Sequence, residues 1–209
     1  RLELNEKMDR KQTKIVLVGG GHCHIQLIKG FNPKTRPKWL EVCVVDSQTH
    51  ASYSGMVPGC VSGHYDNQKS KIDIAAVANW AKCPFYHEEV VDVDFEEKTV
   101  FFKSGGSISY DFISFDIGST TRGSTTIPGA QYIVPTRPIS SLTPLIASKE
   151  QHLLSLSPSP SCVKAVVVGA GLAGIELALS LQGRWKKHFP NLEIDLLDSF
   201  SILLGSETE

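Results

Sequence analysis

Several features that would place this chain in a special class are missing from its 209 residues. No apolar stretch approaches the roughly 18 residues that a membrane-spanning helix needs. Neither sign of charge dominates, because 21 lysines and arginines oppose 22 aspartates and glutamates. Proteins that coat nucleic acid or anionic membranes carry strongly basic patches, so this balance argues against both kinds of partner. We expect small-molecule partners instead.

Paired cysteines and glycosylation sequons are also missing. The five cysteines are an odd number and form neither a Cys-x2-Cys nor a Cys-x4-Cys pair. We therefore expect free thiols in a reducing compartment and, by default, a cytoplasmic protein, with an organellar or peripheral membrane location left open. The run His22-Cys23-His24 contains zinc-ligand residue types, but residues two apart on a helix point to different faces. With no matching second pair, we predict no metal site.

A strand, a glycine turn, a helix and a second strand follow one another near the N-terminus, after a polar tail over residues 1–13. Residues 14–18 form a β-branched apolar run, typical of a buried parallel strand, and glycines occupy positions 19–21. The periodicity is helical over 22–30, and a second apolar run ends at Asp46. This order predicts a β-α-β unit.

The same order returns about 150 residues later. An apolar strand is predicted over 163–168, a glycine turn at 169–174, a helix over 175–188 and a strand over 192–197 that ends at Asp198. The turn carries a complete Gly-x-Gly-x-x-Gly pattern, at Gly169, Gly171 and Gly174. In this context the pattern is typical of dinucleotide binding, although a plain structural turn is the alternative.

The region between the two units contains a different kind of structure. Residues 47–70 are too long and irregular for a simple connection, and long ordered loops are often functional. The other expected elements are a helix at 74–82, an antiparallel meander at 89–94, 99–103 and 108–110, a buried strand at 112–117 and a helix near 139–154.

Glycines in these turns allow a phosphate to approach the helix N-terminus without a Cβ in the way. A carboxylate at the end of the second strand would bind the adenosine ribose diol and repel a 2′-phosphate, so NADH is favoured over NADPH at Asp198. In the first unit His24 stands where the third glycine is expected. That glycine serves helix packing, so its loss weakens the pattern without removing the site.

Two further segments carry a family resemblance. Residues 110–119 (Tyr-Asp-Phe-Ile-Ser-Phe-Asp-Ile-Gly-Ser) resemble a signature of the two-dinucleotide-binding-domain flavoproteins, the FAD/NAD(P)-dependent pyridine nucleotide-disulfide oxidoreductases. Residues 116–118 (Asp-Ile-Gly) stand there for the usual Ala-Thr-Gly. With the first glycine turn, residues 53–65 most resemble the type II NADH dehydrogenase-like branch. Within that branch, the sequence most resembles the oxidoreductase domain that is fused to selenide, water dikinase.

The resemblance implies an α/β fold with two Rossmann-like FAD/NAD(P)-binding domains, each in three layers around a parallel sheet, and a small antiparallel β-meander. The FAD-binding domain would span residues 14–120, and an incomplete NAD(P)H-binding domain would span 121–209. The C-terminal segment that closes the FAD site in the family would be absent, and membrane association is expected only through that segment.

The resemblance also implies roles for particular residues. Those expected at the FAD are Gly19, Gly20, Gly21, His22, Asp46, Ser54, Gly55, Met56, Pro58, Val90 and Gly118. Those expected at NADH are Gly169, Gly171, Gly174 and Asp198, with Glu176 as the catalytic candidate near the nicotinamide. Glu176 could equally be an acid at the start of a helix, where the helix dipole favours it.

The activity implied is an NAD(P)H oxidoreductase that passes a hydride from NADH to FAD and then electrons to a quinone or another small acceptor. The family's redox-active disulfide is not expected, because no Cys-x4-Cys pair exists. The alternative is a redox-sensing or regulatory module of a fused or partner enzyme, such as selenide, water dikinase. The oligomeric state is left open.

Overall fold

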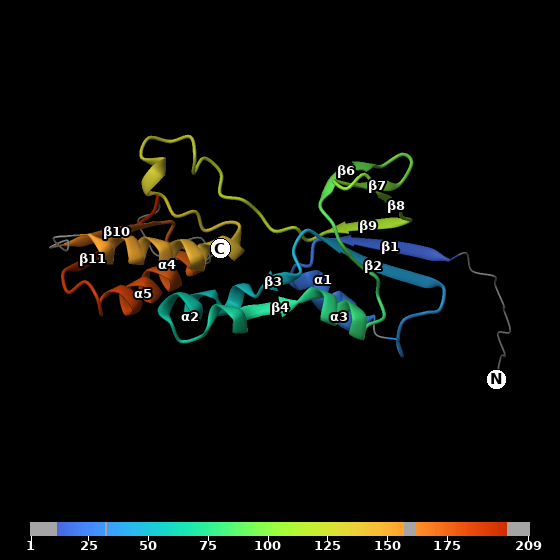
Figure 1. Cartoon of the computed structure of the whole chain (residues 1–209), viewed down its shortest axis with the longest axis horizontal. Helices are drawn as coiled ribbons and strands as arrows, with labels where there is room; N and C mark the ends of the chain where they lie inside the picture. The colour runs from blue at the N-terminus through green and yellow to red at the C-terminus, as the bar shows by residue number, and fades with distance from the viewer. Residues whose placement is uncertain (1–11, 32, 157–161, 200–209) are drawn as a thin grey trace. The chain divides into compact units, whose positions relative to one another are not determined.

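The chain forms two compact units in a computed structural model that describes residues 12–31, 33–156 and 162–199 (Figure 1). The first unit comprises residues 1–51 and 72–118, and the second comprises 52–71 and 119–209. The sequence placed a boundary near residue 120 and put residues 52–71 in the first domain. The contacts group that segment with the second unit, and the predicted nucleotide-binding domains stay a prediction.

A parallel sheet forms the centre of the first unit. Its strands lie in the order β5 (Phe85–His87), β2 (Leu40–Asp46), β1 (Thr13–Val18) and β9 (Phe112–Phe115). All three pairings are parallel. The carboxyl ends of the strands therefore meet at one edge, where open α/β sheets bind their ligands.

Two further layers cover this sheet (Figure 1). Helices α1 (His22–Gly30) and α3 (Ile74–Trp80) lie on one face. The antiparallel meander of β6 (Val90–Asp94), β7 (Thr99–Phe102) and β8 (Ser107–Ser109) lies on the other. The predicted three-layer arrangement with a meander is confirmed for this unit.

Strands β1 and β2 supply both cores because alternate side chains of a strand point to opposite faces. The residues of these strands packed with the helices are Leu17, Leu40, Val42 and Val44. Those packed with the meander are Val16, Val18, Cys43 and Val45. Burial on both faces explains why these strands read as continuous apolar runs.

The segment expected to be irregular contains short regular elements. They are β3 (His50–Ser52), η1 (Ser54–Met56), α2 (Val57–Ser62), η2 (Asn67–Ser70) and β4 (Lys71–Asp73). Strands β3 and β4 pair with each other in a two-stranded sheet. The chain therefore enters and leaves this segment along two strands that pair with each other.

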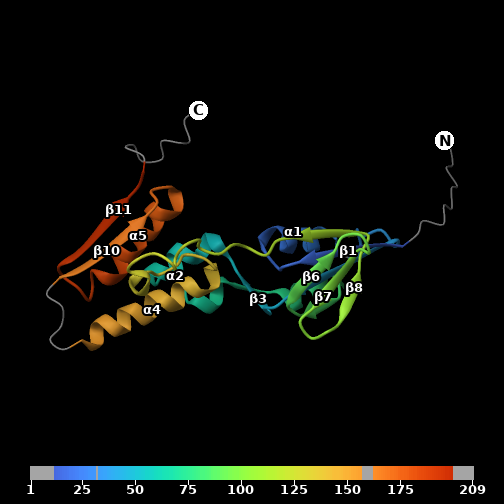
Figure 2. The same cartoon turned by 90° about the horizontal axis from the view of Figure 1, so that it is seen from above.

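In the second unit, β10 (Val163–Val168) and β11 (Leu192–Leu197) pair in parallel, and α5 (Leu172–Trp185) lies along them (Figure 2). Helix α4 (Ile139–Ser155) and η3 (Ala130–Tyr132) precede this pair. The core joins side chains from α2, α4, α5 and both strands, among them Val61, Leu142, Ile146, Val167 and Leu181.

Some expected elements differ in detail. The strand expected to be buried over 112–117 ends at Phe115 and lies at the sheet edge, where Phe112 is 62% exposed, so the predicted burial was wrong. Helix α5 begins three residues before Ile175. Strand β5 was not predicted, because three residues are too few to show a period. Among the described residues, no helix has the length and apolarity to cross a membrane.

Candidate functional site

The first glycine turn joins β1 to α1, and its backbone explains its composition. Gly19 has φ +90°, a conformation that L-residues with side chains rarely adopt. A Cβ at Gly19 would overlap the backbone carbonyl of Asp116, and one at Gly20 would overlap the side chain of Ile74. Gly21 is the N-cap residue of α1. Positions 19 and 20 therefore have no room for a side chain.

Asp46 braces this turn from the end of β2. Its Oδ2 accepts a hydrogen bond from the Gly20 nitrogen at 2.5 Å, and its Oδ1 accepts one from the Gln48 nitrogen at 2.7 Å. The sequence predicts that this carboxylate binds a ribose; in the structure it holds the turn. The predicted residue His22 is the first residue of α1 and is exposed.

A pocket of about 400 Å³ opens beside the turn. The predicted residues Gly19, Asp46 and Val90 line it together with Val18 and Phe115. Small-molecule sites typically have volumes of roughly 300–1,000 Å³. The pocket lies at the carboxyl ends of β1 and β2, and its lining combines apolar residues with four acidic ones, Asp46, Glu88, Glu89 and Asp92. Its volume suits a part of a dinucleotide such as the uncharged adenosine.

His24, at the third glycine position, makes a contact that the sequence did not reveal. Its Nδ1 lies 2.6 Å from the carbonyl oxygen of Gly19, and its Nε2 lies 2.9 Å from Oγ of Ser114 on β9. The ring is buried. The histidine that stands in place of the third glycine therefore links α1, the glycine turn and β9.

Asp116 was noted only as a departure from the family signature. It follows β9, and its Oδ2 accepts a hydrogen bond from the His24 nitrogen at 3.2 Å. A Cβ at Gly21 would overlap its carboxylate. Gly118, which was predicted to allow close approach of the cofactor, has φ +72°, and a Cβ there would meet no described atom within 4 Å.

The second glycine turn repeats the construction of the first. Gly169 has φ +100° and donates to the carbonyl of Leu197 at 2.8 Å. The nitrogen of Ala170 donates to the carboxylate of Asp198, as Gly20 does to Asp46. A Cβ at Gly174 would overlap the carbonyl of Gly169. Gly171 is the N-cap residue of α5.

The remaining predicted residues are not part of either glycine turn. Ser54, Gly55 and Met56 form η1, and Pro58 lies in the first turn of α2, so all four belong to the second unit. Glu176 is exposed on α5. Helix α5 begins at Leu172, so Glu176 is its fifth residue and lies just past the first turn.

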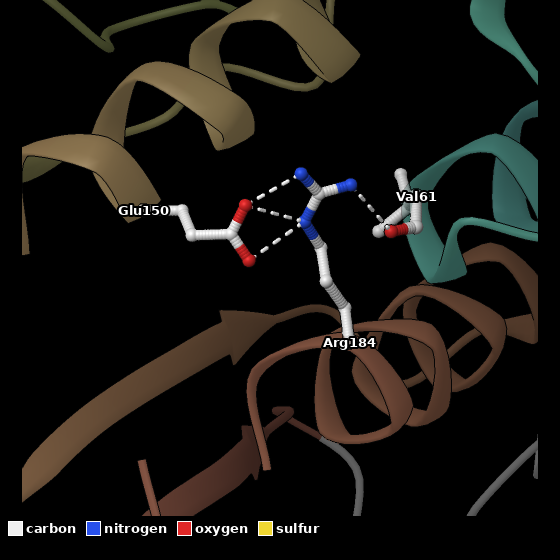
Figure 3. A network of polar contacts seen from close by, with 3 residues as sticks. All are labelled: Val61, Glu150 and Arg184. Atoms are coloured by element: carbon white, nitrogen blue, oxygen red, sulfur yellow. Dashed lines mark hydrogen bonds and ion pairs between the residues drawn. The ribbon is translucent and has the colours of Figure 1, made fainter. Parts of the chain in front are cut away.

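A polar network joins three elements of the second unit (Figure 3). The guanidinium of Arg184 on α5 contacts both carboxylate oxygens of Glu150 on α4, with Nη2 to Oε2 at 2.6 Å. Its Nη1 donates to the carbonyl of Val61 on α2 at 3.2 Å. The ion-paired side chains are only 22% and 10% exposed, so the network fastens the segment around α2 to this unit.

All five cysteines are free thiols in the structure. Burial raises the pKa of Cys43 to about 11. Burial also raises the pKa of Cys83, against the opposing effect of Arg36. Both thiols are therefore kept protonated, the less nucleophilic form. Within the described ranges, no group of three or more histidine, cysteine or acidic side chains is arranged to hold a metal ion.

Comparison with known proteins identifies relatives with this architecture. The chain is 24% identical over 202 residues to the NADH dehydrogenase-like protein YutJ of Bacillus subtilis (strain 168), covering 94% of this chain and 51% of that protein. The chain therefore spans about half the length of this curated relative. The selenide, water dikinase likeness is not supported by these matches.

Solved structures of other oxidoreductases share the fold. The sulfide:quinone oxidoreductase of Aquifex aeolicus superposes with a TM-score of 0.71 at 18% identity, over 91% of this chain and 44% of that one. NDH2 of Plasmodium falciparum, solved with NADH, superposes with a TM-score of 0.72 at 17% identity, over 95% of this chain and 44% of that one. These likenesses confirm the α/β fold.

A family model described as pyridine nucleotide-disulphide oxidoreductase matches residues 13–208. The match includes the meander and the two glycine turns, each with the aspartate that accepts a hydrogen bond from it. The chain therefore belongs to the pyridine nucleotide-disulphide oxidoreductase family, whose members are flavin- and pyridine-nucleotide-dependent oxidoreductases.

Proposed function

We propose that the chain carries the dinucleotide-binding part of an FAD-dependent NADH oxidoreductase. The observation that carries this proposal is the repeated construction of the two turns, in which a strand-end aspartate braces a middle backbone nitrogen. Two such turns in one chain suit two dinucleotides. NADH dehydrogenase-like and sulfide:quinone oxidoreductase relatives support the activity.

In this proposal the first unit holds FAD. Gly19, Gly20 and Gly21 form the turn that would bind the diphosphate, Asp46 would face the adenosine ribose and Val90 lines the proposed adenine pocket. Flavin supplies the capacity to accept a hydride and release electrons singly or in pairs. The residues of the chain orient the nucleotides and exclude water from them.

The second unit would hold NADH. Gly169, Gly171 and Gly174 form the phosphate turn, and Asp198 would accept hydrogen bonds from the ribose diol while repelling a 2′-phosphate. We propose Glu176 as a residue near the nicotinamide, and Ser54, Gly55, Met56 and Pro58 as contacts of the flavin ring system. A quinone is the proposed electron acceptor, since one solved relative is a sulfide:quinone oxidoreductase.

The test is the visible absorption spectrum of the protein with FAD, before and after anaerobic NADH. We expect a bound-flavin band that bleaches when NADH is added. Gly171→Val puts a side chain at the proposed pyrophosphate position and should abolish bleaching while FAD stays bound. Gly183→Val, in open space on the same helix, is the matched control and should bleach normally.

Two results would count against the proposal. Normal bleaching in Gly171→Val would show that the second glycine turn is not the NADH site. Binding of both nucleotides without turnover on any quinone or other acceptor would support the alternative, a redox-sensing module that regulates another enzyme.

A further inference from the structure

Helix α1 supplies no cap or counter-charge of its own. Gly21 is its N-cap residue and makes no side-chain cap hydrogen bond, and the first turn contains no acidic residue. The first amides of a helix lack partners within the helix and carry partial positive charge. An anion is therefore stabilised there, and in a dinucleotide-binding turn that anion is the pyrophosphate.

Asp116 brings a carboxylate to this place from β9. The register of β9 against β1 sets Phe115 opposite Val18, and the Asp116 nitrogen donates to the Val18 carbonyl at 2.8 Å. Asp116 is thereby fixed beside the glycine turn. Its Oδ2 accepts from the His24 nitrogen at 3.2 Å. Its carboxylate also occupies the space next to Gly21 that a Cβ would need.

The second turn has no such arrangement in the part of the chain that the structure describes. Gly171 begins α5 as Gly21 begins α1, and α5 likewise has no acid in its first turn. A Cβ at Gly171 would meet no described atom within 4 Å. The carboxylate beside the first turn therefore comes from Asp116, the residue after β9, and is not part of the glycine turn itself.

We propose that Asp116 is an internal anion at the pyrophosphate position of the first unit and that its carboxylate must leave before a dinucleotide can bind. This inference rests on the proposed function, because it takes the first unit to be a dinucleotide site. Two negative groups at one helix N-terminus repel each other, so Asp116 lowers the affinity for a diphosphate. Removing its charge should strengthen binding, whereas removing a ligand contact would weaken it.

The experiment measures the dissociation constant of FAD for the flavin-free chain by quenching of flavin fluorescence. Asp116→Asn keeps an oxygen that can accept from the His24 nitrogen but removes the charge, and we expect about tenfold tighter binding. Glu96→Gln removes one negative charge from an exposed turn of the meander and is the control, with unchanged affinity. Equal or weaker binding by Asp116→Asn would overturn the inference.

Displacement of bound FAD by two competitors locates the effect. ADP carries a diphosphate and adenosine carries no phosphate, so Asp116→Asn should improve displacement by ADP and leave displacement by adenosine unchanged. An equal gain for both competitors would contradict the inference, because it would show a general change in the pocket.

A second variant, Asp116→Ser, guards against misfolding of the first. It also offers an uncharged oxygen and should tighten FAD binding in the same direction. If Asp116 only capped α1, both variants would lower the melting temperature without tightening FAD binding. Failure of the wild type and both variants to bind FAD would instead overturn the proposed function, and this inference with it.

Discussion

At the scale of single residues, Gly19 combines two constraints that can be separated by experiment. Gly19→Ala should lower the free energy of unfolding by about 3 kcal/mol, from a strained positive φ and from overlap with the Asp116 carbonyl. Gly105 has φ +93° and open space around it, so Gly105→Ala reports the strain alone, about 1 kcal/mol. Urea denaturation measures both. Equal losses would show that the overlap has no cost.

Cys43 predicts a pH dependence of stability. Burial raises its pKa from 9.0 to about 11, so the unfolded thiol ionises first as the pH rises. The contribution to stability is fully present below pH 9 and is lost between about pH 9 and 11. At pH 10 we expect the wild type to have lost roughly 1 kcal/mol more than Cys43→Ala, relative to pH 8. Parallel curves for the two proteins in urea denaturation would contradict this.

The carboxylate of Asp198 should determine the preference for NADH over NADPH. Asp198→Ser should shift the ratio of NADPH to NADH affinity towards NADPH by about tenfold, because the carboxylate that repels a 2′-phosphate is gone. Titration of both nucleotides against bound-flavin reduction measures the ratio. Asp195→Ser, on an exposed position of the same strand, is the control, with an unchanged ratio.

The sequence predicts glycine positions well because their requirements are local. A positive φ or a close approach forbids a Cβ at Gly19, Gly169 and Gly174 whatever lies farther away. Contacts made across the fold were not predicted. Asp116 meets the nitrogen of His24 across 92 residues, and only the unexpected acid in a signature that usually has alanine pointed to it.

At the scale of secondary-structure elements, the Arg184–Glu150 pair joins α5 to α4, and its removal should be costly. Glu150→Gln leaves the guanidinium of Arg184 without its partly buried counter-charge, so we expect a loss of about 3 kcal/mol. The exposed pair Lys103–Glu89 is the control, and Glu89→Gln should have a much smaller effect, because solvent screens this pair. Equal effects in urea denaturation would show that burial does not strengthen the first pair.

Elements with a sustained period were predictable, and short ones were not. Strand β1 and helix α1 follow from runs long enough to show burial on one or both faces. Strand β5 has three residues, and α2 has six, so neither shows a period. The burial of Val61 on α2 comes from packing with Leu142 and Ile146, some eighty residues later, which no local pattern encodes.

At the scale of the whole molecule, the structure assigns residues 52–71 to the second unit although both of their neighbours in sequence belong to the first. Two observations support this assignment. Val57 and Val61 are buried in the core of the second unit, and Arg184 donates to the Val61 carbonyl. The stability of α2 should therefore follow that of α4 and α5.

Hydrogen exchange tests this assignment with two matched variants. Val61 and Val44 are both fully buried, one in the second unit and one in the first. Each change to alanine should cost about 2 kcal/mol, because it removes buried methyl groups and leaves a cavity. Val61→Ala should speed amide exchange in α2, α4 and α5, whereas Val44→Ala should speed it in β1 and β2. Faster exchange in β1 after Val61→Ala, with α5 unchanged, would return residues 52–71 to the first unit.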